Sequence, residues 1–198
     1  MTELSKTELA INNHRTIFNK TVKSVSDGMG KTERALKIST NKKLNKKVTI
    51  GKYKGFPMVS LTLEERATCP RYCHHWDDCY GNNMMFAHRI EHGLELEKRI
   101  ESEVAELCGL YRGVIIRLHV LGDFYSKEYV LLWGGLLRKH DNLAIWGFTG
   151  YEPTSEIGLA IRAVQVGYGD RFAVRFSNAP QYKFSANSAD LYKPEKNK

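Results

Sequence analysis

The chain has 198 residues, of which 42% are hydrophobic and 26% are charged, and its formal net charge is +8. This length suffices for one domain with a real core, and the composition fits a soluble globular protein. No run of about 18 apolar residues occurs, which excludes a membrane-spanning helix. The N-terminus also lacks the basic-then-apolar pattern of a secretory signal. We therefore expect a single cytoplasmic domain over residues 1–198, with no membrane partner.

Residues 1–54 are predicted to form an N-terminal helix followed by a basic, β-like segment that includes a short strand-like run at 47–51. The helix is expected over residues 2–23, because its apolar side chains fall near one stripe of a 3.6-residue period. That stripe comprises Leu9, Ile17, Phe18 and Val22.

The segment from Lys31 to Lys54 contains nine Lys or Arg residues and one acid, Glu33. A basic segment of this kind suits a polyanion, nucleic acid above all. A solvated, lysine-rich hairpin explains the same pattern, since no stacking aromatic residues alternate with the lysines. We therefore expect at most weak, non-specific binding to nucleic acid that added salt removes.

Strand-like and helix-like patterns alternate over residues 55–180. The strands are predicted over 56–63, 113–120, 143–149 and 171–177, and the helices over 83–108, 126–140 and 153–166. This alternation predicts an α/β fold, either a partial (β/α) barrel or a small parallel sheet with right-handed crossovers. The loops after the strands then share one edge, where active sites of such folds lie. The polar tail over 181–198 is expected to be flexible.

Each predicted strand has an apolar face and a face that turns polar toward its end, because successive side chains alternate between the two sides of a sheet. The apolar faces, expected to lie under the helices, carry Leu61, Leu63, Ile116, Leu118, Val120, Trp146, Phe148, Val174 and Phe176. The opposite faces carry Ser60, Thr62, Arg117, His119, Gly147, Thr149, Arg175 and Ser177. Buried parallel strands are normally apolar on both faces, so the polar faces indicate a cavity beside the strand ends. A structural alternative pairs Arg117 and Arg175 with buried acids, such as Asp123 or Asp170.

Three cysteines follow the first predicted strand with the spacing Cys-x3-Cys-x5-Cys: Cys69, Cys73 and Cys79. Because thiols stay reduced in the cytoplasm, this compact loop favours a metal over a disulfide. Zinc would take a fourth ligand from His74 or His75, whereas a four-iron cluster would take the three thiolates and leave one iron open. The spacing alone does not choose between these metals.

The fourth cysteine, Cys108, is predicted to be a core residue. On a continuous helix over 83–108 it would lie roughly 37 Å along the axis at ~1.5 Å per residue, at the opposite edge of the sheet. It also follows Val104 by four residues, on the apolar stripe of that helix.

The run SLTLEERATCPRYC, with the later CYG and RLHVLGDFYSKEYVLLW, resembles the phage gene-product-88 family over residues 55–180. A three-cysteine loop after one strand, with a glycine-acid motif after the next, also resembles the radical S-adenosylmethionine superfamily, whose usual spacing is Cys-x3-Cys-x2-Cys. The resemblance implies that Cys69, Cys73 and Cys79 hold a [4Fe-4S] cluster. It also implies that the methionine part of S-adenosylmethionine binds the open iron, and that Gly122 and Asp123 lie in the loop that contacts its amino group.

The leading hypothesis is thus a phage-type iron–sulfur protein of the host-cell cytoplasm that binds a small anionic or zwitterionic ligand; its catalytic residues are not assigned. Candidate fourth ligands of the cluster are His74, His75 and His119. Candidate ligand-binding residues are Arg117, His119, Gly122, Asp123, Thr149, Arg175, Ser177 and Asn178. The alternatives are a non-catalytic cluster protein for electron transfer, sensing or structure, and a zinc-stapled nucleic-acid-binding module.

Overall fold

The computed structural model describes residues 5, 8, 12–27, 29–30, 33–39, 45–177, 179 and 185–186. The strands are β1 (Val22–Lys23), β2 (Lys37–Ile38), β3 (Met58–Ser60), β4 (Arg89–Ile90), β5 (Val114–Leu118), β6 (Leu143–Thr149), β7 (Phe172–Ser177) and β8 (Ser185–Ala186). The α-helices are α2 (Glu65–Thr68), α3 (Leu94–Leu110), α4 (Lys127–Lys139) and α5 (Glu156–Tyr168), and short 3-10 helices span Asn19–Thr21 and Tyr80–Asn83. None of these helices is long and apolar enough to cross a membrane.

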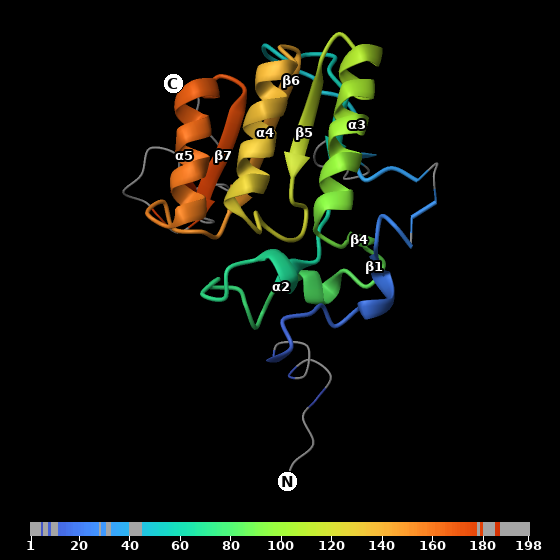
Figure 1. The fold of residues 1–198 in the computed structure, drawn as a ribbon, viewed down its shortest axis with the longest axis vertical. Helices are drawn as coiled ribbons and strands as arrows, with labels where there is room; N and C mark the ends of the chain where they lie inside the picture. Colours follow the sequence, from blue (N-terminus) through green and yellow to red (C-terminus); the bar gives the residue numbers. More distant parts are fainter. Residues whose placement is uncertain are drawn as a thin grey trace.

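The main sheet has six strands in the order β2-β3-β5-β6-β7-β8. All neighbours from β3 to β8 are parallel, and β2 pairs antiparallel with β3 at one edge. The three crossover helices α3, α4 and α5 lie next to one another on one face of this sheet (Figure 1). The predicted α/β fold with a small parallel sheet is confirmed, and the described strands form an open sheet, not a closed barrel.

Two of the crossover helices begin at serine caps that the sequence places directly before their apolar faces. The Ser126 hydroxyl accepts a hydrogen bond from Tyr129 N at 3.0 Å, and the Ser155 hydroxyl accepts one from Gly158 N at 3.0 Å. Each cap satisfies a backbone donor that the helix itself leaves unpaired. These caps fix where the loops after β5 and β6 end.

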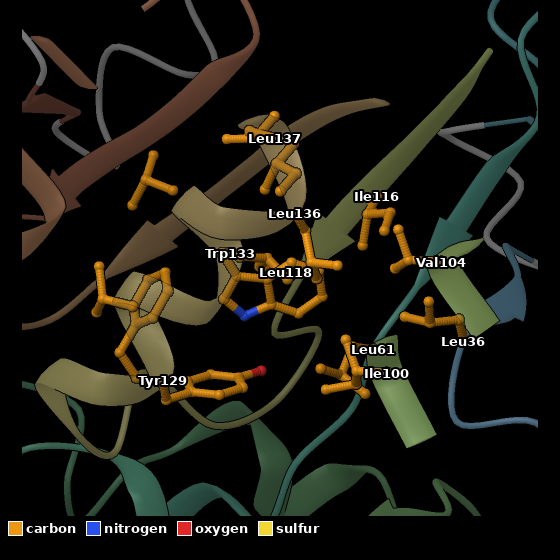
Figure 2. Close-up of a cluster of buried hydrophobic side chains, with 14 of the residues drawn as sticks. Leu36, Leu61, Ile100, Val104, Ile116, Leu118, Tyr129, Trp133, Leu136 and Leu137 are labelled. Carbon is orange, nitrogen blue, oxygen red and sulfur yellow. The ribbon is translucent and has the colours of Figure 1, made fainter. Parts of the chain in front are cut away.

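The core lies between the sheet and the three helices. Trp133 and Tyr129 of α4 point toward β5, where Leu118 faces them (Figure 2). On the same face of the sheet, Val104 of α3 lies near Ile116 and Ile100 lies near Leu61. All of these side chains are almost fully buried. Burial of this kind contributes on the order of 1.5–3 kcal/mol per large apolar side chain, so the helix-covered face dominates the stability of the fold.

The other face of the sheet is covered only in part. Met58, Ile115 and Ala144 form a second apolar cluster there under Val48, Tyr53 and Phe56, and Trp146 packs against it. Trp146 is paired in register with Arg117, whose guanidinium carbon lies 5.4 Å from the indole ring centre. Phe148 lies on the same face, one alternation further along the strand.

The prediction that Trp146 and Phe148 face the helices is therefore wrong. Gly147 occupies the helix-facing position instead, beside Leu118, because paired positions in neighbouring strands point the same way. A Cβ atom at Gly147 would lie 2.8 Å from Leu118 O, so only glycine fits this position.

Two of the predicted helices are shorter than expected. Within the described part of residues 2–23, the chain after His14 forms the 3-10 helix Asn19–Thr21 and β1, and not an α-helix. The helix expected over 83–108 begins only at Leu94, because β4 pairs with β1 before it.

Of the basic segment, Lys47 forms an isolated bridge to Pro57, while residues 40–44 lie outside the described chain. In the predicted tail, Ser185–Ala186 pair with β7, and the rest of 181–198 also lies outside the described residues.

Candidate metal and ligand site

The cysteine loop begins at α2, a single helical turn between β3 and Cys69. Cys69 N donates to Glu65 O at 2.8 Å, and the helix ends there because Cys69 has an extended backbone conformation. Consecutive turns follow, closed by bonds from Cys73 N to Pro70 O and from Asn82 N to Cys79 O. Figure 1 shows α2 beyond the ends of the strands, on the side to which the arrow of β5 points. The cysteines thus reach the carboxyl-terminal edge of the sheet through this helical turn, and not directly from a strand.

A cavity of about 450 Å³ lies at this edge, and all three loop cysteines line it. Its lining comes from α2, the cysteine loop and the ends of β5, β6 and β7. It comprises Glu65, Cys69, Cys73, His74, His75, Cys79, Tyr80, Arg117, His119, Leu121, Gly122, Asp123, Phe148, Thr149, Gly150 and Ser177. We call this space the cysteine cavity. It brings together residues from four predicted loops that are distant in the sequence.

Three described residues that the sequence singled out, Arg175, Cys108 and Asp170, do not line the cysteine cavity. Arg175 is exposed on β7, at the position paired with Phe148. Asn178 lies outside the described residues. Cys108 is buried among the core side chains of α3, as expected, although its helix begins eleven residues later than predicted. Asp170, the alternative partner for an arginine, is exposed and pairs with Lys52 at 3.2 Å.

The turn after β5 depends on a glycine. Gly122 has φ +84°, and a Cβ atom there would lie 2.6 Å from Thr68 Oγ1 and 2.7 Å from Leu63 Cβ. Any other residue would therefore be strained and would collide with the segment that carries α2. This close approach seats the turn against the cysteine loop.

Asp123 connects the loops after β5 and β6. Its carboxylate accepts hydrogen bonds from Phe124 N at 2.8 Å and from Gly150 N at 2.7 Å. Complete burial raises its pKa to about 7, and these backbone donors offset only part of that effect. No cation forms an ion pair with this carboxylate among the described residues.

His119 lies just past the end of β5 with φ +57°, which breaks the alternation of the strand. Its Nε2 lies 3.3 Å from the Tyr129 hydroxyl of α4, and its ring meets Phe124 edge to face at 4.7 Å. The expectation that Arg117 and His119 point the same way does not hold, because the ring turns toward α4 while Arg117 lies over Trp146. Burial lowers the pKa of His119 to about 3, so the ring is neutral at physiological pH.

Arg117 forms a wall shared by two cavities. The second cavity, of about 400 Å³, lies on the open sheet face and is lined by Ser60, Thr62, Lys37 and His88 among others. Burial lowers the pKa of Arg117, and no described carboxylate lies within ion-pair distance of its guanidinium. The group is therefore placed to meet an anion in either space.

Burial raises the pKa of all three loop thiols. For Cys69 the negative charges of Asp123 and of the other two thiolates add to this effect. The thiols are therefore neutral unless a cation joins them. As they stand, the described residues contain no group of three or more Cys, His, Asp or Glu side chains arranged to hold a metal ion.

A second group of polar side chains, with buried Glu64, Glu65 and Arg89, meets the cavity at Glu65, and sequence reasoning missed it. Glu65 pairs with Arg89, whose Nε lies 2.7 Å from Oε2. Glu64 accepts hydrogen bonds from Arg15 Nε at 2.7 Å and from Thr16 N at 2.9 Å. We call these five residues the paired cluster. The sequence signal for this group was the pair of adjacent acids at 64–65, which lies between the apolar strand residues and the cysteines.

The fold and the site define an open-sheet α/β protein with a cysteine-lined cavity at the carboxyl-terminal edge of its parallel strands. A family model described as Gene product 88 matches residues 34–155, which is more than half of the chain. The chain therefore belongs to this phage protein family, as the sequence motifs suggested. Neither the curated proteins nor the solved structures contain a match.

Proposed function

We propose that the chain is an iron–sulfur protein that holds a [4Fe-4S] cluster on Cys69, Cys73 and Cys79. The observation that carries the proposal is the convergence of all three thiols on one cavity at the sheet edge. Burial keeps these thiols protonated, and a bound cation would compensate the thiolate charge that burial disfavours.

The size of the cavity supports a cluster over a single zinc ion. A zinc site draws its ligands to about 2.0–2.3 Å from one point, whereas each thiolate of a four-iron cube binds a different iron. The three thiols line a cavity of about 450 Å³, which is more room than one ion needs.

Three thiolates leave one iron for another ligand. His74 and His75 are exposed at the rim of the cavity and His119 is buried in its wall, so each is a candidate. The alternative is a small anionic or zwitterionic molecule, with its carboxylate on Arg117, which binds such groups in bidentate fashion. Thr149 and Ser177 add hydroxyl groups to the same lining.

If that molecule is S-adenosylmethionine, the cluster supplies the electron that cleaves it reductively. The chain itself would then contribute three functions. Arg117 would bind the carboxylate, and the turn at Gly122–Asp123 would face the amino group. The helix-covered sheet would keep water away from the side of the cavity that it borders. If a histidine takes the fourth iron, the protein is a non-catalytic cluster protein for electron transfer, sensing or structure.

A zinc-stapled nucleic-acid-binding module is the remaining candidate. It is favoured by the two histidines that line the cavity beside the cysteines, which together offer a Cys3His set. In each version we expect the protein to act in the host-cell cytoplasm, where its thiols stay reduced.

Cysteine variants test the proposal. Cys69→Ala, Cys73→Ala and Cys79→Ala should each lose the iron and acid-labile sulfide of anaerobically purified protein, while Cys108→Ala should keep both. Circular dichroism of each variant checks that the fold remains. Iron loss in the Cys108→Ala protein with an intact fold would overturn the assignment.

Incubation with S-adenosylmethionine and dithionite then separates the catalytic from the non-catalytic version. Cleavage of the cofactor by wild type, and its reduction in Arg117→Ala at unchanged iron content, would support the catalytic version. An iron-loaded protein that leaves S-adenosylmethionine intact would exclude it.

A further inference from the structure

Arg66 is a buried cation beside the cysteine loop, and its side chain is only partly satisfied. It lies in α2, three residues before Cys69, and is 3% exposed. Its Nη2 donates to Trp76 O at 3.1 Å and to Asn82 Oδ1 at 3.0 Å. Its Nε and Nη1 are buried and have no hydrogen-bond partner in the part of the chain that the structure describes.

The acids nearest in the sequence are already used elsewhere. Glu65 pairs with Arg89, and Glu64 pairs with Arg15, so neither neutralises Arg66. The buried Arg89 differs from Arg66 because each of its guanidinium nitrogens has an acceptor. Besides its bonds to Glu65, it donates to Thr21 Oγ1 and to three backbone carbonyls. Because burying a guanidinium without an anion is unfavourable, Arg66 needs a negative partner that the described residues do not supply.

The position of Arg66 identifies that partner. Its two acceptors, Trp76 and Asn82, flank Cys79 on either side in the sequence. These two hydrogen bonds hold the Arg66 guanidinium against the segment that carries Cys79, while Nε and Nη1 remain without an acceptor among the described residues.

We infer that Arg66 is the counter-cation of the cysteine site: it pairs with the negative charge of the loaded metal–thiolate centre and holds the segment around Cys79 in place. This inference rests on the proposed function. With a four-iron cluster bound, the positive charge favours the reduced, more negative cluster, and the reduction potential rises. Arg66 is thus a positioning residue that also tunes the centre, because it acts through the cysteine thiolates and not on a substrate.

The test is a redox titration of anaerobically reconstituted protein, in which dithionite supplies one electron per cluster and paramagnetic resonance reports the reduced form. Removal of the charge in Arg66→Gln should lower the equilibrium constant for reduction at least tenfold, which is 59 mV for a one-electron couple. Arg66→Lys keeps the charge and should retain most of the wild-type potential.

A matched control is Arg71, which lies in the cysteine loop just after α2. Arg71 is exposed, so solvent and salt screen its charge, and Arg71→Gln should leave the potential almost unchanged. If Arg66→Gln keeps its iron and sulfide but has the wild-type potential, the inference is overturned and the proposed function stands. If Arg66→Gln is folded but contains no iron, the iron content of Arg66→Lys decides. Iron in the lysine variant supports the inference, and its absence there contradicts it. A wild-type protein without iron contradicts the proposed function and this inference with it.

Discussion

Two groups of buried polar side chains meet at the edge of the sheet, and they differ in how their charges are balanced. In the paired cluster, each buried acid has a basic partner, and Arg89 has acceptors for all of its nitrogens. Around the cysteine cavity, three thiols, Asp123, Arg66 and Arg117 have no ion-pair partner among the described residues. The short helix α2 contributes one residue to each group, Glu65 to the first and Arg66 to the second. The difference motivates the proposal that the first group stabilises the fold and that the second binds a metal centre or an anionic ligand.

The largest effect should come from breaking the paired cluster. Arg89→Met leaves Glu65 buried without its cation, and we expect a loss of about 3–5 kcal/mol in the free energy of unfolding. Urea denaturation of metal-free protein measures this loss. The control is Lys98→Ala, which removes an exposed ion pair with Glu95 and should cost no more than about 0.5 kcal/mol. Equal losses in the two variants would show that the buried pair is not what holds α2.

An intermediate effect is expected at the contact between the two groups. Thr68 Oγ1 donates to Glu64 O at 2.8 Å and accepts from Asp123 N at 3.1 Å, so it links α2 to the loop after β5. Thr68→Val keeps the shape but leaves a buried N–H unpaired, at a cost of about 1–3 kcal/mol. Thr68→Ser keeps the hydroxyl and should recover most of the loss. Thermal unfolding of both variants checks this difference, and a serine variant as unstable as the valine variant would contradict it.

The same substitution made on the unpaired side should have little effect on stability. Arg117→Met removes a half-buried guanidinium that has no described carboxylate partner and keeps an apolar chain over Trp146. The expected cost is the cation–π contact alone, about 0.5–1 kcal/mol, in the metal-free protein. A loss as large as that of Arg89→Met would mean that Arg117 is structural and would remove it from the ligand site.

The smallest effect concerns an ion pair at the surface. Hydrogen bonds from Lys23, and then from Lys37, lower the pKa of Glu33 to about 2. Because the folded pKa lies below the unfolded value of 4.5, the stability from this group is present above pH 4.5 and is lost as the pH falls toward 2. Glu33→Gln should therefore be slightly less stable than wild type at neutral pH, and the difference should disappear as the pH falls through about 2. A difference that persists in acid would exclude this origin.

The sequence was sufficient for the parallel order of the sheet and for the place of the cysteine loop at its edge. Alternating strand and helix patterns allow few topologies, and loops after parallel strands must share an edge. Cys108 was also predicted correctly as a core residue, because its spacing from Val104 shows the apolar stripe of α3.

The wrong predictions concern side chains whose direction or pairing depends on contacts between distant segments, which a local sequence pattern does not reveal. Trp146 and Phe148 were expected under the helices because they are apolar, but Gly147 takes that side where the β6 backbone approaches Leu118. His119 was expected to follow the strand alternation, which ends one residue earlier. The charges of Arg66 and Arg89 gave no local sign that one would be paired and the other would not, since their partners come from segments up to 68 residues away.

The most direct test of the central claim is the iron and acid-labile sulfide content of wild-type protein purified and reconstituted without oxygen. The account predicts four irons and four sulfides per chain, with the brown colour of thiolate-to-iron charge transfer. One zinc per chain with no sulfide, or a folded protein that takes up no metal, would contradict it.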